Sequence, residues 1–268
     1  MKYRRVMFVT DRLVYLQLQK TGCTHIARLL AQICPGEQVQ KHNRLPPELR
    51  ASGRIILGSI RNPWDWYLSL WSYGCGKKGA LYKRLVARDL DRNKASASGN
   101  LSEKHSPLFA WHNAYGNNDE PEHFRQWLRM VQNPDNRYDL GERYAESPLS
   151  LGNGFFTYRY LYLYTGNLET LFSPAITSPE NLRAVIENDN LLDFTIRNEQ
   201  LEDDLVKGLA HCGITLNQDQ TNLIYSAPRT NTSLRRKPAA DYYDRDTIEL
   251  VRARDQFLIE KYRYTAPS

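Results

Sequence analysis

The chain has 268 residues, of which 41% are hydrophobic and 25% are charged. This composition is ordinary for a soluble globular protein and leaves room for one large domain with a sizeable core. The formal net charge of +6 favours anionic partners such as a nucleotide, a sulfated or phosphorylated ligand, nucleic acid or a membrane surface, although a solvated basic surface explains it equally well.

The four cysteines, Cys23, Cys34, Cys75 and Cys212, form neither a CxxC pair nor a zinc spacing. They are too few for a disulfide framework, so we interpret them as free thiols in a reducing compartment. No apolar run reaches the roughly 20 residues of a membrane helix, and the N-terminal residues lack the features of a signal peptide. We therefore expect a cytoplasmic protein without an integral membrane segment.

The first strand is predicted at residues 12–19, RLVYLQLQ, an apolar and β-prone run. Apolar residues then recur at the spacing of one helical face, which predicts a helix packed on a sheet: Ile26, Leu29, Leu30 and Ile33. The sequence Cys34-Pro35-Gly36 ends this helix.

A second short apolar run, RIILGSI at residues 54–60, is typical of a strand buried on both faces. Asn62-Pro63 ends it, and a helix follows in which Trp64, Leu68 and Trp71 share one face. Two strand–loop–helix units in succession predict an α/β fold with a central parallel sheet flanked by helices.

The middle of the chain, residues 74–160, mixes charge, glycine and serine, and only 123–132 (HFRQWLRMVQ) is a plain helix candidate. We predict a partly irregular, partly helical insertion that shapes a substrate cleft within a single domain spanning 1–268. The tyrosine-rich segment 157–166 could stack on sugar rings or belong to the core, and core is the commoner explanation.

The last third begins with a predicted strand at 193–199 (DFTIRNE) and a helix at 201–213 whose leucines recur every four residues. Gly213 is expected to cap that helix. A polar, basic loop at 227–238 follows, and an amphipathic helix is predicted over 246–262.

The turn between the first strand and the first helix reads QKTGCTH. Backbone N–H groups at a helix start form an anion site, to which Lys20 adds a positive charge. Thr21 and Thr24 add hydroxyl donors, and Gly22 permits close approach of the backbone. The lysine precedes the glycine, so this is not a Walker A loop. A plain strand–helix turn with an exposed lysine is the alternative interpretation.

A second polar turn follows the strand at 54–60, with Arg61 at its start and Ser69 eight residues later. Ligands of open parallel sheets bind outside the carboxyl ends of the strands, so both turns are expected to open on one edge. Arg61 can grip a phosphate with two hydrogen bonds, and Ser69 can donate to it. An arginine salt-bridged at a helix start is the alternative.

Taken together, QKTGCTHI and SIRNPWDWYLSLW resemble the two nucleotide-binding motifs of the sulfotransferases that use 3′-phosphoadenosine 5′-phosphosulfate (PAPS). The first resembles their 5′-phosphosulfate loop, and the second resembles their 3′-phosphate motif, Arg-x-Pro with a serine eight residues after the arginine. RNEQLEDDL and the C-terminal stretch from NTSLRRKP onward are similar to the end of bacterial and Golgi carbohydrate-type members. The middle of the chain is unmatched, and Cys23 and His25 depart from the usual pattern.

The resemblance implies a P-loop-like sulfotransferase architecture and an enzyme that moves a sulfuryl group from PAPS to an acceptor hydroxyl. Lys20 would stabilise charge on the leaving group, the residues of its loop would hold the 5′-phosphate, and Arg61 with Ser69 would hold the 3′-phosphate. The loop at 227–238 would close over the nucleotide, a solvated basic loop being the alternative. The donor-binding residues so implied are Lys20, Thr21, Gly22, Cys23, Thr24, His25, Arg61, Ser69, Ser233, Arg235 and Arg236.

The acceptor needs a general base, for which histidine is the natural choice. The candidates are His42, His105, His112, His123 and Glu199. We favour His42, which lies in a polar loop after the first helix, where several family members place a base or an acceptor-binding residue. A surface-loop histidine is the alternative interpretation.

No metal-binding cluster is evident in the sequence, and sulfuryl transfer requires none. The acceptor implied is a glycan or glycolipid hydroxyl, with a small natural product still open. One alternative is a nucleotide kinase-like phosphoryl transferase with a degenerate P-loop, disfavoured because GK[ST] and an obvious Mg²⁺ carboxylate are missing. A basic module for nucleic acid or anionic polysaccharide ranks last, since acids and bases are interleaved.

Overall fold

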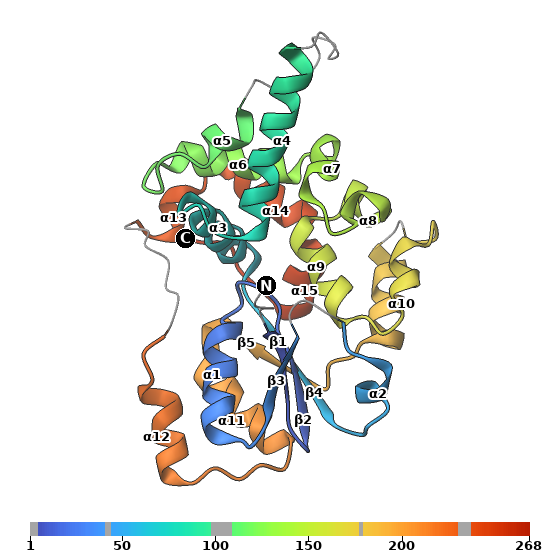
Figure 1. The fold of residues 1–268 in the computed structure, drawn as a ribbon, viewed down its shortest axis with the longest axis vertical. Helices are drawn as coiled ribbons and strands as arrows, with labels where there is room; N and C mark the ends of the chain where they lie inside the picture. The colour runs from blue at the N-terminus through green and yellow to red at the C-terminus, as the bar shows by residue number, and fades with distance from the viewer. Residues whose placement is uncertain (1–4, 41–43, 98–108, 177–178, 230–236) are drawn as a thin grey trace. The chain divides into compact units, whose positions relative to one another are not determined.

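The computed structural model describes residues 5–40, 44–97, 109–176, 179–229 and 237–268. It is an α/β structure with mostly helices and, in the described part of the chain, one five-stranded mixed sheet (Figure 1). The strands are β1 (Arg5–Val9), β2 (Leu13–Leu16), β3 (Glu37–Gln40), β4 (Ile55–Ile60) and β5 (Phe194–Arg197).

The helices account for most of the remaining described residues. The α-helices are α1 (Cys23–Ile33), α2 (Pro47–Arg50), α3 (Pro63–Cys75), α4 (Ala80–Ala97), α5 (Ala110–Ala114), α6 (Pro121–Gln132), α7 (Arg137–Leu140), α8 (Leu149–Gly152), α9 (Phe155–Tyr164), α10 (Pro179–Asp189), α11 (Leu201–His211), α12 (Gln218–Ser226), α13 (Ala239–Tyr242), α14 (Arg245–Arg254) and α15 (Gln256–Tyr262). Short 3-10 turns are η1 (Pro134–Asn136), η2 (Tyr144–Glu146), η3 (Leu168–Phe172) and η4 (Asn198–Gln200). None of the helices in the described ranges is both long enough and apolar enough to cross a membrane.

The chain divides into two compact units. The first comprises Met1–Asn62, Arg159–Leu171 and Ser178–Thr232 and contains the sheet. The second comprises Pro63–Tyr158, Phe172–Thr177 and Ser233–Ser268 and is helical where described. The segment predicted as an insertion, 74–160, falls almost wholly in the second unit.

The sheet is mixed: the predicted parallel strands are present, but one edge of the sheet, which the prediction did not include, is antiparallel. Its strand order is β3-β1-β2-β4-β5, in which β2, β4 and β5 run parallel while β1 pairs antiparallel with both β2 and β3. The physical reason is the short link between β1 and β2, since so few residues can join only antiparallel neighbours. The Thr10 side chain closes this turn by accepting hydrogen bonds from Arg12 N at 3.0 Å and Leu13 N at 2.9 Å.

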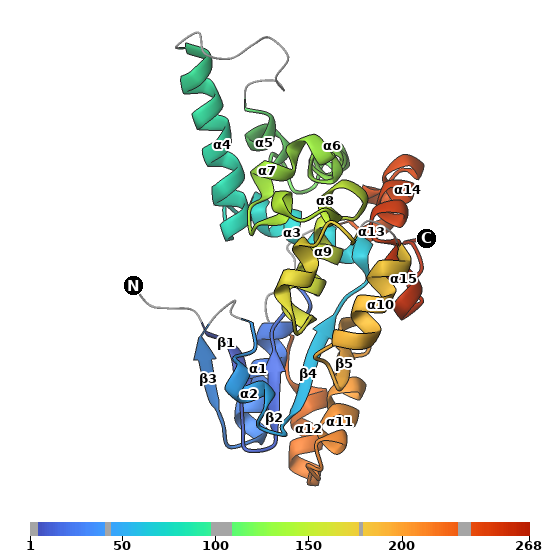
Figure 2. The ribbon, with the colours of Figure 1, turned by 90° about the vertical axis from the view of Figure 1, so that its right-hand side faces the viewer.

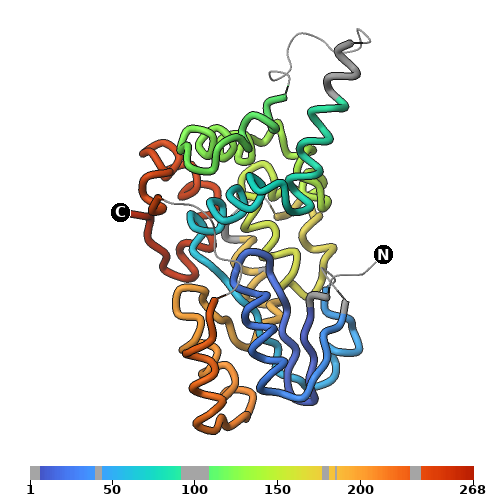
Figure 3. Tube along the Cα trace, turned by 60° about the vertical axis from the view of Figure 1, so that its left-hand side comes forward, coloured from blue at the N-terminus to red at the C-terminus, as the bar shows by residue number. Residues whose placement is uncertain are grey.

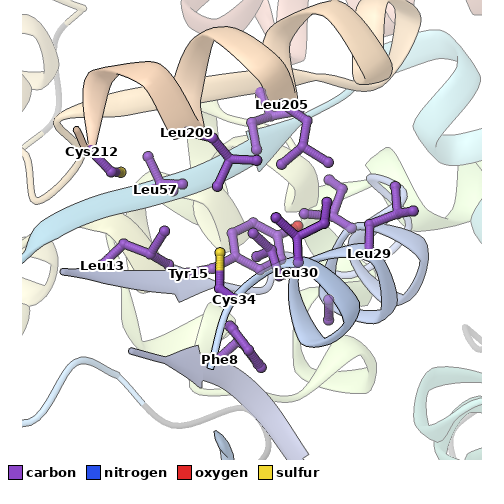
Figure 4. Packing of buried hydrophobic residues seen from close by; sticks show 14 of the residues in the cluster. Phe8, Leu13, Tyr15, Leu29, Leu30, Cys34, Leu57, Leu205, Leu209 and Cys212 are labelled. Atoms are coloured by element: carbon purple, nitrogen blue, oxygen red, sulfur yellow. The ribbon is translucent and has the colours of Figure 1, made fainter. Parts of the chain in front are cut away.

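One face of the sheet packs against α1 and α11, and Figure 4 shows the leucines that fill this layer. Alternate residues of β2, Leu13 and Tyr15, point into it and are fully buried. Burying a leucine side chain contributes about 1.5–3 kcal/mol, so this layer is a main source of stability for the first unit. The trace in Figure 3 shows α11 and α12 running beside α1, and the predicted leucines of α11, Leu201, Leu205 and Leu209, are buried in this layer.

On the other side of the sheet, β4 packs against Tyr164 at the carboxyl end of α9. A Cβ added at Gly58 would lie 2.7 Å from Leu192 and 3.0 Å from Tyr164, so a larger residue there would force these side chains to shift. The Tyr164 hydroxyl accepts from Ser59 N at 3.0 Å and donates to Ser59 O at 2.9 Å. Tyr158, Tyr160 and Tyr164 are all buried, so these tyrosines of the predicted aromatic segment belong to the core.

In the second unit, α3 and α5 pack on α6 (Figure 2). The predicted helix at 123–132 is confirmed as α6, and its buried residues include Phe124, Trp127 and Leu128. The helix α3 is buried nearly all round, beyond the single face predicted, and Trp66 stacks on Phe156 at a ring separation of 4.2 Å.

The predicted continuous helix over 246–262 is wrong, because Asp255 separates α14 from α15. Its buried carboxylate accepts hydrogen bonds from Thr157 N at 2.9 Å, Thr157 Oγ1 at 2.7 Å and Tyr67 Oη at 2.8 Å. Gln132 Nε2 adds a fourth donor at 3.4 Å. A buried carboxyl group needs such partners, and at this residue the backbone leaves the helical conformation, with φ at −116° and ψ at 23°.

Candidate functional site

The candidate site lies in the first unit, where three parallel strands end at one edge of the sheet. The register pairs Tyr15 of β2 with Leu57 of β4, and Ile60 of β4 with Arg197 of β5. A polar turn follows each strand: 17–22 after β2, 61–62 after β4 and 198–200 after β5. The prediction that the lysine-bearing and arginine-bearing turns share an edge is therefore confirmed.

The helix α1 begins at this edge with a start suited to an anion. Its N-cap is Gly22, with a φ of +79°, and its first turn contains no acidic residue. The left-handed backbone favours glycine, and a Cβ at Gly22 would also lie 2.6 Å from Asn198 Nδ2 and 2.7 Å from Leu201 Cδ1, so these side chains would have to shift. The positive end of the helix dipole is thus not neutralised by a carboxylate of its own first turn.

Lys20 and Arg61 bring two positive charges together. Lys20 has a left-handed backbone, with φ at +67°, and Arg61 Nη1 lies 3.5 Å from the Lys20 carbonyl oxygen. Burial and then the charge of Arg61 lower the pKa of Lys20 from 10.5 to about 8, with a smaller opposing contribution from Cys23. Two neighbouring cations, one of which lowers the pKa of the other, form a site whose repulsion a bound anion would relieve.

Thr21 lies under the loop instead of facing outward. It is fully buried, and its Oγ1 donates to Leu18 O at 2.7 Å and pairs with Ser59 Oγ at 2.7 Å. Ser59 Oγ in turn lies 2.8 Å from Tyr15 Oη. In this conformation the Thr21 hydroxyl ties the loop to β4, whereas Thr24 is exposed.

His25 follows on the first turn of α1. Its backbone N–H donates to Gly22 O at 2.9 Å, so this amide serves the helix in the present conformation. Its side chain is only 2% exposed, and neither ring nitrogen has a hydrogen-bond partner in the part of the chain that the structure describes. Burial and the charge of Arg28 lower the pKa of His25, with Glu202 opposing and Arg229 adding to the shift. The imidazole is therefore neutral near physiological pH.

The turn after β5 and the segment near Arg229 complete the edge, and sequence reasoning missed most of this contribution. Arg229 forms a two-pronged ion pair with Glu202, with N···O distances of 3.0 and 2.7 Å. Its hydrogen bonds lower the pKa of Glu202, and the carboxylate raises the pKa of Arg229 in return. Asn62 N donates to Glu199 Oε1 at 2.7 Å. One signal in the sequence could have indicated these residues. A strand was predicted at 193–199, and the residues after its carboxyl end were therefore expected at the same edge of the sheet as the other two turns.

The remaining predicted residues are not among the described residues at this edge of the first unit. Ser69 is buried on α3 of the second unit, 7% exposed. Two candidate bases also belong to that unit: His112 is exposed, and His123 Nδ1 accepts from Asn117 N at 3.0 Å. The other predicted residues lie outside the described residues: His42, His105, Ser233, Arg235 and Arg236.

Within the described ranges, no group of three or more histidine, cysteine or carboxylate side chains is arranged to hold a metal ion. No protein-family model matches the sequence. Comparisons with curated proteins and with solved structures likewise gave no match.

Proposed function

We propose that this protein is a PAPS-dependent sulfotransferase with a P-loop-like architecture, and that the edge formed by the turns after β2, β4 and β5 binds the donor. The observation that carries the proposal is the convergence of Lys20 and Arg61 beside the acid-free start of α1. The resemblance of the two motifs to those of the sulfotransferases supports the same conclusion.

The donor would sit between groups suited to its two phosphate ends. The amides at the start of α1, other than that of His25, which donates to Gly22 O, would receive the 5′-phosphosulfate together with Lys20. Arg61 would hold the 3′-phosphate, with Ser69 as the second group that the motif implies. The buried ring nitrogens of His25, which have no hydrogen-bond partner among the described residues, support a ligand beside α1, because such nitrogens cost free energy unless something bonds them.

When bound, the donor supplies the sulfuryl group, and 3′,5′-bisphosphoadenosine leaves as the acceptor oxygen gains it and loses its proton to a base. Lys20 would stabilise the charge that grows on the leaving phosphate, which makes its contribution larger in the transition state than in the ground state. We keep His42 as the proposed base and a glycan or glycolipid hydroxyl as the proposed acceptor.

We further propose a cytoplasmic location, which the free state of Cys23, Cys34, Cys75 and Cys212 supports. The acceptor would be identified by incubation with labelled PAPS and an acceptor panel, followed by mass spectrometry of the products.

Thermal-shift measurements test the donor assignment directly. A ligand that binds only the folded state stabilises it by about 2.7 kcal/mol at a hundredfold excess over its Kd. We expect 3′,5′-bisphosphoadenosine to raise the melting temperature without metal, and Mg·ATP to have no comparable effect. Stabilisation by Mg·ATP alone would replace this proposal with the kinase-like alternative.

A further inference from the structure

Glu199, which the sequence suggested only as a base for the acceptor, links two of the three turns at the site. Ile60 and Arg197 are paired residues at the ends of β4 and β5. Asn62 and Glu199 each lie two positions beyond that pair. The Asn62 N–H donates to Glu199 Oε1 at 2.7 Å, so a side chain continues the link between the strands after the backbone ladder has ended.

The turn that carries Arg61 is constrained by the proline that follows it. The chain must leave β4 and enter α3 at Pro63, which has no N–H to donate. The residue before a proline is also kept out of the helical region, so Asn62 cannot simply extend the helix backward. A defined hydrogen bond at Asn62 therefore helps to set where Arg61 lies.

The contact belongs to a series that connects all three turns. Glu199 links the β5 turn to the β4 turn, and Arg61 Nη1 approaches the Lys20 carbonyl oxygen of the β2 turn at 3.5 Å. Glu199 is exposed and also contributes favourably to the charged state of Arg229. A carboxylate beside an anion site would repel the ligand, so its presence calls for a role other than contact with the donor.

We infer that Glu199 is a positioning residue: through its hydrogen bond to Asn62 N–H it holds Arg61 in place for the 3′-phosphate of the donor. This role rests on the proposed function. It requires a side-chain oxygen at the distance from the backbone that lets it accept from the Asn62 N–H, and it does not require the negative charge. Glutamine keeps that oxygen, alanine removes it, and aspartate keeps the charge but withdraws the oxygen by one methylene.

The experiment measures Kd for 3′,5′-bisphosphoadenosine and for 5′-AMP by calorimetry on the full chain, with the melting temperature of each ligand-free variant. We expect Glu199→Ala and Glu199→Asp to weaken bisphosphate binding ~10-fold, while 5′-AMP, which lacks the 3′-phosphate, is little affected. Glu199→Gln should restore bisphosphate binding to near the wild-type value. The matched control is Glu48→Ala, which removes another exposed carboxylate, from α2, and should bind as wild type.

Three results would overturn the inference: Glu199→Ala binding as tightly as wild type, Glu199→Gln binding as weakly as Glu199→Ala, or an equal loss for both nucleotides. The aspartate variant decides the matter if the alanine variant fails to fold. A wild-type protein with no preference for the bisphosphate would instead refute the proposed function and, with it, this role. Retention of that preference by Glu199→Ala would refute the role alone.

Discussion

The guanidinium of Arg61 lies 3.5 Å from the backbone carbonyl oxygen of Lys20, so the turns that follow the neighbouring parallel strands β4 and β2 meet directly. Arg61 was expected at this edge because ligands of parallel sheets bind beyond the carboxyl ends of the strands. The contact also brings the Arg61 charge close enough to lower the pKa of Lys20. The site is thus a pair of cations whose mutual repulsion a phosphate would remove.

Arg61→Ala should weaken binding of 3′,5′-bisphosphoadenosine by one to two orders of magnitude, because a hydrogen bond to a charged group contributes about 1.5–3 kcal/mol. Arg61→Lys should recover only part of the loss, since lysine lacks the two-pronged geometry. Calorimetry checks both variants. Unchanged affinity in Arg61→Ala would contradict the assignment of Arg61 to the 3′-phosphate.

Lys20 should make the stability of the ligand-free protein depend on pH. Its folded pKa is about 8 against an ordinary 10.5, so between these values the unfolded chain binds more protons than the folded protein. Below pH 8 the charged Lys20 destabilises the folded protein by its full amount. This destabilisation disappears as the pH rises towards 10.5, so the contribution of Lys20 to the free energy of unfolding should increase by roughly 3 kcal/mol.

Urea unfolding of wild type and Lys20→Met at both ends of that pH window measures this contribution. The difference in free energy of unfolding between the two proteins should change by most of this roughly 3 kcal/mol between pH 8 and pH 10.5. The same pH dependence in both proteins would show that the Lys20 amine is not destabilised by its surroundings.

Thr21→Val should destabilise the protein by about 1–3 kcal/mol, because it leaves buried partners of the hydroxyl, Leu18 O and Ser59 Oγ, without their hydrogen bond. Thr21→Ser keeps the oxygen and should lose much less. Chemical denaturation measures the stability, and calorimetry measures bisphosphate binding. A valine variant that keeps its stability but loses affinity would place the hydroxyl on the ligand instead.

His25→Leu should raise the stability of the ligand-free protein by about 1–2 kcal/mol, since it removes two buried nitrogens without partners in the described chain. It should also weaken bisphosphate binding if those nitrogens serve a ligand. His211→Leu, at an exposed position on α11, is the matched control and should change neither quantity. Loss of stability with full affinity would make His25 an ordinary core residue.

The elements of the site were predictable because their signals are local. The stripe from Ile26 to Ile33 and the buried run at 55–60 define α1 and β4, and Gly213, with its φ at +69°, ends α11 as expected. The strand β1 was missed because its short apolar run directly follows basic residues at the start of the chain, and the antiparallel edge of the sheet was missed with it. The sequence also predicted that Thr21, as a polar residue of the turn, would offer its hydroxyl to a ligand, but it did not indicate that this side chain points inward.

The remaining features depend on contacts between distant parts of the chain. The pairing of Arg229 with Glu202 joins residues 27 positions apart, and that of Asn62 with Glu199 joins residues 137 positions apart. At the break between α14 and α15, the Asp255 side chain is held by hydrogen bonds from three other helices, α3, α6 and α9. No window of sequence contains both partners of such contacts, so periodicity could not indicate them.

The depressed basicity of Lys20 has a practical consequence. At pH 8 about half of its side chains carry a free amine, whereas an ordinary lysine is almost entirely protonated. Acylating reagents applied under mild conditions should therefore modify this lysine ahead of the surface ones, and a molecule seated over it should shield it. The rate at which Lys20 is acylated therefore reports whether the site is occupied, and this measurement needs no knowledge of the acceptor.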